Sequence, residues 1–263
     1  MKVGIFSDIH GNCVALEAIL RHLDRERVDR VVCLGDIAGN GPQPRDAIAR
    51  VRALGCPVVM GNGEAQLLRP VLAKDGGESM RRSYEIYRWG AAQLSNAERA
   101  FIGGFPPTTT VPLGNAATLL CCHGSPRSYY EGIRGETPER EMDEMLTGVV
   151  ATVVACGHTH RPFVRRHRGL LVINPGTVGA AMVVAADGSR QLAPWGEYAV
   201  VTWDDGVIGI DCRRVPIDLA AVRVTTIASG MPHARWWLDA FADVPRIASV
   251  PRIADPDDDG TAT

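Results

Sequence analysis

The amino-acid sequence predicts an α/β fold that contains mixed β-sheets. Its first sixty residues alternate short apolar runs with segments of helical periodicity, a pattern typical of parallel strands connected by helices. The second half consists mostly of short apolar runs separated by turn residues, which favours a second, mixed sheet. Hydrophobic residues make up 46% of the 263 positions, enough for a buried core, so a chain that is disordered throughout is excluded.

Three apolar runs near the N-terminus predict buried strands at residues 3–6, 30–34 and 57–60. Helices are predicted between them, over residues 13–23 and 44–54. Asn12 is a suitable N-cap for the first helix, and Pro44 suits the first turn of the second. Because helices separate the three strands, we expect the strands to pair in parallel.

The stretch from Glu64 to Phe105 is predicted to be largely helical. Within it, Ser95 and Glu98 form a capping box for a segment that runs to Ile102. We interpret residues from about 74 to 104 as a helical insertion in a single domain that spans residues 1–250. The remaining residues, 251–263, are rich in aspartate and have little to bury, so we expect a flexible tail.

The second half of the chain is predicted to be rich in strands. These strands are expected at residues 108–111, 116–122, 151–156, 163–166, 170–173, 181–184, 198–203 and 207–212. Helices are expected at residues 138–146, 217–227 and 233–242.

Charge, hydropathy and cysteine content exclude several classes of protein. The net charge of −2 offers no basic face for a long nucleic acid, although a small nucleotide stays possible. No apolar run reaches the roughly 18 residues that a membrane helix needs, and the N-terminus lacks the features of a signal peptide. The seven cysteines include no C-x-x-C motif, which favours free thiols in a reducing compartment. We therefore expect a cytoplasmic location.

Five apolar runs end in side chains that are able to bind a metal ion. These side chains belong to Asp8, His10, Asp36, Asn62, His123, His158 and His160. Ligands of open α/β sheets bind beyond the carboxyl ends of the strands, so the five ends are expected to converge on one site. Residues two apart in an extended chain point to the same side, and on this ground we expect Asp8 and His10 to face one point.

Carboxylate, amide and imidazole ligands together suit borderline divalent metals such as Mn, Fe, Co, Ni or Zn. Seven ligands are too many for one tetrahedral ion but enough for two ions that share a ligand, and Asp36 is a natural bridge because a carboxylate has two oxygens. A single histidine after a strand is more often structural, whereas five such ends together predict a metal site. His22, His167 and His233 follow no apolar run, and no metal role is predicted for them.

The set of motifs resembles the calcineurin-like metallophosphoesterase family. The motifs are Asp8-x-His10, Gly35-Asp36, Gly61-Asn62, His123-Gly124 and Gly157-His158-x-His160. The resemblance extends to the branch of small bacterial phosphodiesterases and diadenosine-tetraphosphatase-like enzymes, through sequences around Gly41, Ser125 and Asn174. It implies a four-layer α/β/β/α sandwich of two mixed β-sheets flanked by helices.

The resemblance also implies the metal ligands and the reaction. It assigns one metal to Asp8, His10, Asp36 and His160. It assigns the other metal to Asp36, Asn62, His123 and His158. Two divalent ions, with Mn favoured, would hydrolyse phosphodiester or phosphoanhydride bonds of small nucleotide-type substrates through a metal-bridging hydroxide. In this interpretation Asp36, Asn62 and His123 are catalytic.

The third motif departs from the family's usual pattern. Gly63 stands where relatives often have a histidine that protonates the leaving oxygen, and its absence favours substrates with good leaving groups. Two alternatives stay open. One is a phosphomonoesterase, including protein-phosphatase-like activity, which the missing histidine disfavours. The other is a non-catalytic scaffold of the same fold, which the presence of all seven ligand residues disfavours.

Residues outside the motifs give weaker indications. Arg127 and Tyr129 are candidates for holding a phosphate or stacking a base, although an ordinary surface loop explains them as well. Glu64 is expected either to orient a metal ligand or to serve as an acid at a helix N-terminus. Trp236 and Trp237 are expected to pack on the body of the fold or on a partner subunit, which leaves a homo-oligomer possible. The helical insertion either overhangs the metals or presents a solvated face through Arg81, Arg82, Tyr84 and Arg88.

Overall fold

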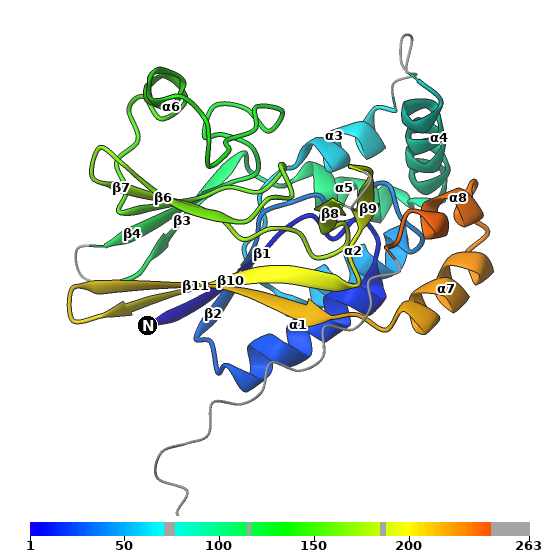
Figure 1. Cartoon of the computed structure of the whole chain (residues 1–263), viewed down its shortest axis with the longest axis horizontal. Helices are drawn as coiled ribbons and strands as arrows, with labels where there is room; N and C mark the ends of the chain where they lie inside the picture. Colours follow the sequence, from blue (N-terminus) through cyan, green and yellow to red (C-terminus); the bar gives the residue numbers. More distant parts are fainter. Residues whose placement is uncertain (71–76, 115–116, 185–187, 243–263) are drawn as a thin grey trace, which may run out of the picture.

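The computed structural model describes residues 1–70, 77–114, 117–184 and 188–242. Two β-sheets lie face to face, and helices cover their outer faces (Figure 1). The predicted tail, residues 251–263, lies outside the described residues. Within the described ranges, no helix is long and apolar enough to cross a membrane.

The first sheet has the strand order β11-β10-β1-β2. Its strands are β1 (Lys2–Phe6), β2 (Arg30–Cys33), β10 (Trp195–Asp204) and β11 (Val207–Pro216). β1 and β2 pair in parallel, as predicted, whereas β10 pairs antiparallel to β1. The third parallel strand predicted at residues 57–60 is reduced to one bridge, between Cys33 and Val58. Pairing stops there because the Met60 N–H donates to the Pro106 carbonyl instead.

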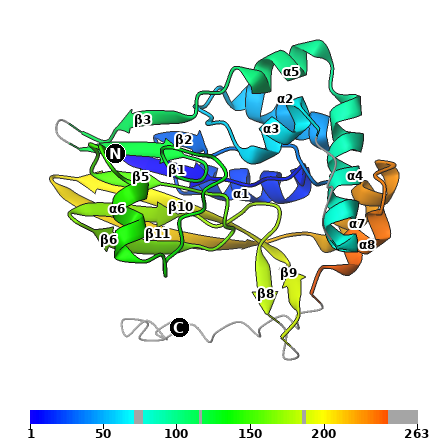
Figure 2. The same ribbon diagram turned by 90° about the horizontal axis from the view of Figure 1, so that it is seen from above.

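The second sheet has the order β3-β4-β5-β7-β6. Its strands are β3 (Thr108–Pro112), β4 (Thr118–Cys122), β5 (Val153–Ala155), β6 (Phe163–His167) and β7 (Leu170–Asn174). The three inner strands are parallel and the two edge strands antiparallel, so this sheet is mixed, as expected. The strand predicted at residues 181–184 joins neither sheet. It forms β8 (Met182–Val184), which pairs with β9 (Arg190–Leu192) in a ribbon that projects from the sandwich (Figure 2).

Alternating side chains of the strands divide the core into three layers. On β4, Leu119 and Cys121 pack against the first sheet, whereas Cys122 lies in the cluster below α6 (Glu139–Met145). On β1, Ile5 faces the second sheet and Phe6 faces the helices on the opposite side. This period of two is what a strand buried on both faces requires. The four-layer α/β/β/α sandwich is therefore confirmed.

The remaining helices surround the first sheet. They are α1 (Cys13–Arg25), α2 (Pro44–Leu54), α3 (Asn62–Leu68), α4 (Glu78–Gln93), α5 (Asn96–Gly103), α7 (Leu219–Ala228) and α8 (Ala234–Asp239). Asn12 caps α1, since its side-chain oxygen accepts a hydrogen bond from the Ala15 N–H at 3.1 Å. Ser95 and Glu98 form the predicted capping box of α5. Among described residues, the segment predicted to be largely helical contains α3, α4 and α5.

The layer between the two sheets contributes to stability through fully buried side chains. Leu119 is fully buried there, so Leu119→Ala should lower the free energy of unfolding by about 2–5 kcal/mol through lost burial and a residual cavity. Val207 is 68% exposed, and Val207→Ala should change that free energy by no more than about 0.5 kcal/mol. Denaturant unfolding of both variants tests the comparison, and equal losses would contradict it.

Candidate metal centre

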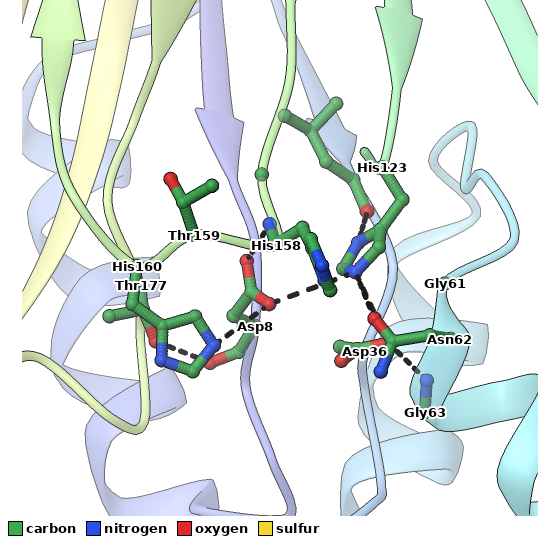
Figure 3. A network of polar contacts seen from close by, with 12 residues as sticks. Asp8, Asp36, Gly61, Asn62, Gly63, His123, His158, Thr159, His160 and Thr177 are labelled. Atoms are coloured by element: carbon green, nitrogen blue, oxygen red, sulfur yellow. Dashed lines mark hydrogen bonds and ion pairs between the residues drawn. The ribbon is translucent and has the colours of Figure 1, made fainter. Parts of the chain in front are cut away.

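Loops at the carboxyl ends of four strands, together with the start of α3, carry the predicted ligand residues. Asp8 and His10 follow β1, and Asp36 follows β2. His123 follows β4, whereas His158 and His160 follow β5. Asn62 is the first residue of α3. Figure 3 shows Asp8 between His160 on one side and His123 on the other.

One group of ligand atoms is formed by Asp8, His10 and His160, whose donor atoms lie within 4.8 Å of one another. His160 Nε2 is 3.1 Å from Asp8 Oδ1 and 3.0 Å from His10 Nε2. Asp8 is fully buried and His10 nearly so, and the two residues come from the same loop. These three side chains form a compact site open on one side.

A second group is formed by Asp8, Asp36 and His123, again within 4.8 Å. His123 Nε2 is 3.5 Å from Asp36 Oδ1 and 2.9 Å from Asn62 Oδ1. The other oxygen of Asp36, Oδ2, lies 3.9 Å from His10 Nε2. Asp36 therefore has one oxygen near each group, as a shared ligand requires, and Asp8 is a member of both groups.

His158 lies at the edge of these groups. Its backbone N–H donates to Asp8 Oδ2 at 3.1 Å, and its ring centroid is 5.2 Å from that of His123. The structure thus brings all seven predicted residues to one place, with His158 outside the two compact groups.

Hydrogen bonds from Nδ1 to backbone carbonyls orient the His10 and His123 rings so that Nε2 is the atom available to a cation. His10 Nδ1 lies 2.8 Å from the Gly39 carbonyl oxygen, and His123 Nδ1 lies 2.7 Å from that of Leu34. A carbonyl only accepts, so each Nδ1 carries the proton and each neutral ring keeps its lone pair on Nε2. His123 Nε2 then faces Asn62, Asp36 and Asp8 oxygens, all acceptors. Positive charge stabilises such a cluster of acceptors, and its oxygen and nitrogen atoms are of the kinds that bind divalent metals.

Burial and the charged groups around them shift the pKa values of Asp8 and His123. Burial acts to raise the pKa of Asp8, but His160 and His123 outweigh it and hold this pKa below its usual value. Burial acts to lower the pKa of His123, and the Asp36 and Asp8 carboxylates raise it above its usual value. The field of the two buried carboxylates thus favours positive charge at the position that His123 Nε2 faces.

Five of the seven predicted ligand residues have left-handed backbone conformations. Their φ angles are 57° for Asp8, 50° for His10, 53° for Asp36, 65° for His158 and 57° for His160. Such conformations cost about 1–3 kcal/mol each in non-glycine residues. The expectation that Asp8 and His10 share a direction because the chain is extended is therefore wrong in its reason. Left-handed turns aim these side chains at the site.

Hydrogen bonds between the first two loops hold these turns in place. The backbone N–H groups of Asp8 and His10 donate to the carbonyls of Gly35 and Asp36, at 3.0 and 2.9 Å. The loops after β1 and β2 consequently form one unit. Thr177, which the sequence did not indicate, donates its hydroxyl to the Asp8 carbonyl at 2.8 Å.

Glu64 fulfils both roles that the sequence left open. It is fully buried, and its carboxylate accepts hydrogen bonds from the N–H groups of Asp36, Ile37 and Gly61 at 2.8, 2.7 and 3.0 Å. The bond to Gly61 satisfies the N–H of the residue that precedes α3, and the other two fix the loop that carries Asp36. Burial and the nearby Asp36 carboxylate raise the pKa of Glu64 to about 7.

A cavity of about 350 Å³ adjoins the ligand groups. Its lining at one end comprises His10, Asp36, Asn62, His158 and His160. The sequence did not indicate the rest of the lining, which includes Asn40, Tyr87, Gly179, Ala180, Leu192 and Ala240. Trp236 and Trp237 also line it, so the expectation that they only pack on the body of the fold or a partner is incomplete.

The two candidate substrate residues lie elsewhere. Arg127 pairs with Glu131, with Nη2 2.5 Å from Oε1, and lines a separate hollow with Glu144. The Tyr129 ring contacts that of Tyr130 in a tilted arrangement, at a centroid distance of 4.8 Å and an interplanar angle of 50°. Neither residue is among those that line the cavity beside the ligand groups. A substrate contact by either stays a prediction.

Comparison with known proteins agrees with the fold and the site. Residues 1–205 match the calcineurin-like phosphoesterase superfamily domain. The buried carboxylates and imidazoles at the strand ends form groups that could hold a metal ion, which fits a family of metal-dependent phosphoester hydrolases. The chain belongs to the calcineurin-like phosphoesterase superfamily.

Individual relatives support this assignment. A crystal structure of a metallophosphoesterase from Sphaerobacter thermophilus has 26% sequence identity and a TM-score of 0.70, and the match covers 91% of this chain and 98% of that one. A hypothetical protein from Pyrococcus horikoshii OT3 has a TM-score of 0.71 at 18% identity, over 88% and 94% of the two chains, and supports the fold alone. An uncharacterized protein of Methanocaldococcus jannaschii is 26% identical over 177 residues, 67% of this chain and 69% of that protein.

Gly63 occupies a space in which a side chain would displace Asp36. A Cβ at this position would lie 2.8 Å from Asp36 Oδ1 and 2.9 Å from its Cγ. Because the Asp36 carboxylate is buried, Gly63→Ala should lower the affinity for Mn²⁺ by about 10- to 100-fold, as measured by isothermal titration calorimetry. Gly103→Ala is the control, since its Cβ would make only ordinary contacts of 3.7 Å with Leu68. Unchanged affinity of the Gly63 variant would refute the prediction.

Proposed function

We propose that the protein is a dinuclear metal-dependent phosphoesterase that hydrolyses phosphodiester or phosphoanhydride bonds of small nucleotide-type substrates. The observation that carries the proposal is the position of Asp36, whose two oxygens face the two groups of ligand atoms. One ion would be held by Asp8, His10, Asp36 and His160. The other would be held by Asp36, Asn62, His123 and His158.

Two bound cations would supply Lewis-acid chemistry, acidifying a water molecule and neutralising phosphate oxygens. The protein's own residues hold the ligand side chains in position and keep water away from the site. Glu64 fixes the loop of Asp36 through two backbone hydrogen bonds, and the Gly39 and Leu34 carbonyls fix the rings of His10 and His123. Asp8, Asp36 and His123 are each at most 2% exposed, so charges in this site are weakly screened by water.

The absence of a side chain at Gly63 supports a preference for good leaving groups. A proton donor at this position would clash with the Asp36 carboxylate in this structure. A leaving group of low basicity departs without a proton, as activated diesters and phosphoanhydrides permit. This argument favours a phosphodiesterase over the phosphomonoesterase alternative.

The cavity size supports a small substrate. Its volume of about 350 Å³ is near the lower end of the range for small-molecule sites. It offers room for part of a nucleotide, whereas a long nucleic acid would need a groove with many cationic side chains. The scaffold alternative requires no hydrolysis. A substrate bound and hydrolysed at the metals therefore separates this proposal from that alternative.

Substrate preference and metal dependence are tested together. With Mn²⁺ added, the protein should hydrolyse bis-p-nitrophenyl phosphate faster than p-nitrophenyl phosphate, because both release the same p-nitrophenolate and the cavity accepts the second ester group of the diester. A chelator should abolish both activities. Release of p-nitrophenolate is followed by absorbance. Hydrolysis at equal rates with and without metal would refute the proposal, and faster hydrolysis of the monoester would favour the phosphomonoesterase.

Removal of the shared ligand should affect both ions. Asp36→Ala is expected to lower Mn²⁺ affinity and diester hydrolysis by more than about 100-fold, since loss of an outer-shell partner alone costs 10- to 100-fold. His22→Ala is the control, because His22 hydrogen-bonds the Tyr198 hydroxyl at 2.5 Å and is not part of the cavity lining. Calorimetric stoichiometry of the wild type should be two ions per chain. A stoichiometry of one would contradict the dinuclear centre.

A further inference from the structure

The end of the cavity beyond the metal ligands is built by three segments that are distant in sequence. α4 and α8 lie side by side in both ribbon views (Figures 1 and 2). His233, which precedes α8, lies with Nε2 2.5 Å from Glu85 Oε2 of α4. Leu192 of β9 donates its N–H to the Ala240 carbonyl at 2.6 Å, which attaches the ribbon to the end of α8. These contacts fix the far wall of the cavity.

Three aromatic side chains line this wall. Tyr87 of α4 packs its ring on Gly39, where an added Cβ would lie 2.1 Å from Tyr87 Cε1. Trp237 is buried, with its ring centroid 5.1 Å from that of Phe241. Trp236 is half-buried, and the Arg82 guanidinium lies 5.6 Å from its ring centroid. The indole of Trp236 is therefore supported by a cation while it also borders the cavity.

Asn40 adds a polar group to the same lining. Its side-chain oxygen is buried and has no hydrogen-bond partner among the described residues. The backbone of Asn40 is left-handed, with φ of 65°, a conformation that asparagine adopts more readily than most other residues. A buried acceptor without a donor costs free energy, and a ligand that supplies an N–H group would remove that cost.

We propose that this wall binds the nucleobase of the substrate, with the base stacked on Trp236 and Tyr87 and its exocyclic or ring N–H groups within reach of Asn40. The inference rests on the proposed function, because the metal centre would hold the phosphate at the other end of the same cavity. Stacking of a base on an aromatic side chain contributes substantially and tolerates different bases. A planar ring with hydrogen-bond donors at its edge can stack on the aromatic side chains and also donate to the Asn40 oxygen. An alkyl or sugar group can do only one of these.

Binding of AMP and of ribose 5-phosphate tests the inference, since the two ligands share a sugar phosphate and differ in the base. With Mn²⁺ present, the wild-type protein should bind AMP about 5- to 100-fold more tightly than ribose 5-phosphate in isothermal titration calorimetry. Trp236→Ala should remove most of this difference and leave the affinity for ribose 5-phosphate unchanged. Trp236→Phe should retain part of the preference, because a smaller ring still stacks.

A matched control is Trp195→Ala. Trp195 also has an arginine over its ring, Arg214 at 4.9 Å from the centroid, but it does not line the cavity. This variant should keep the wild-type preference for AMP. Equal binding of the two ligands by the wild type, or equal weakening of both by Trp236→Ala, would overturn the inference. Base preference without hydrolysis would refute only the proposed function, whereas hydrolysis without base preference would refute only the base site.

Discussion

Two buried carboxylates, Asp8 and Asp36, have ligand atoms within 4.8 Å of each other, and their repulsion has to be overcome by the rest of the fold. Several features oppose it. Asp36 Oδ1 accepts a hydrogen bond from the Gly63 N–H at 2.6 Å, and Asp8 Oδ2 accepts one from the His158 N–H. Backbone carbonyls fix two imidazole rings from behind. A bound cation would convert the remaining repulsion into attraction.

The two-sheet architecture makes this arrangement possible. β1 and β2 are parallel neighbours in one sheet, and β4 and β5 are parallel neighbours in the other, so four loops emerge at one edge of the sandwich. Left-handed turns then reverse the chain within a few residues, and hydrogen bonds between the loops of β1 and β2 compensate for the conformational cost. The cores on both sides of each sheet keep the strand ends in position, which links packing far from the site to its chemistry.

Most of this organisation was predictable from the sequence, because each ligand directly follows an apolar run and the order of the runs defines parallel strands. The left-handed backbone of Asp8 and His10 was not predictable, because it depends on carbonyls of Gly35 and Asp36 in another loop. The strand β9 was missed because Arg190–Leu192 is short and mostly polar, and its pairing with β8 comes from tertiary context. The position of Trp236 beside the cavity was not predictable either, because it depends on contacts between α8 and α4, which are some 148 residues apart in the sequence.

The match to the superfamily ends at residue 205, whereas α8 begins at Ala234. The predicted ligand residues lie within the matched region, and so do Asn40, Tyr87 and Leu192 of the cavity lining, whereas Trp236 and Trp237 follow it. The wall of the cavity is thus assembled from both sides of residue 205. A substitution in α8 can therefore reshape the cavity without altering any of the seven predicted ligand residues.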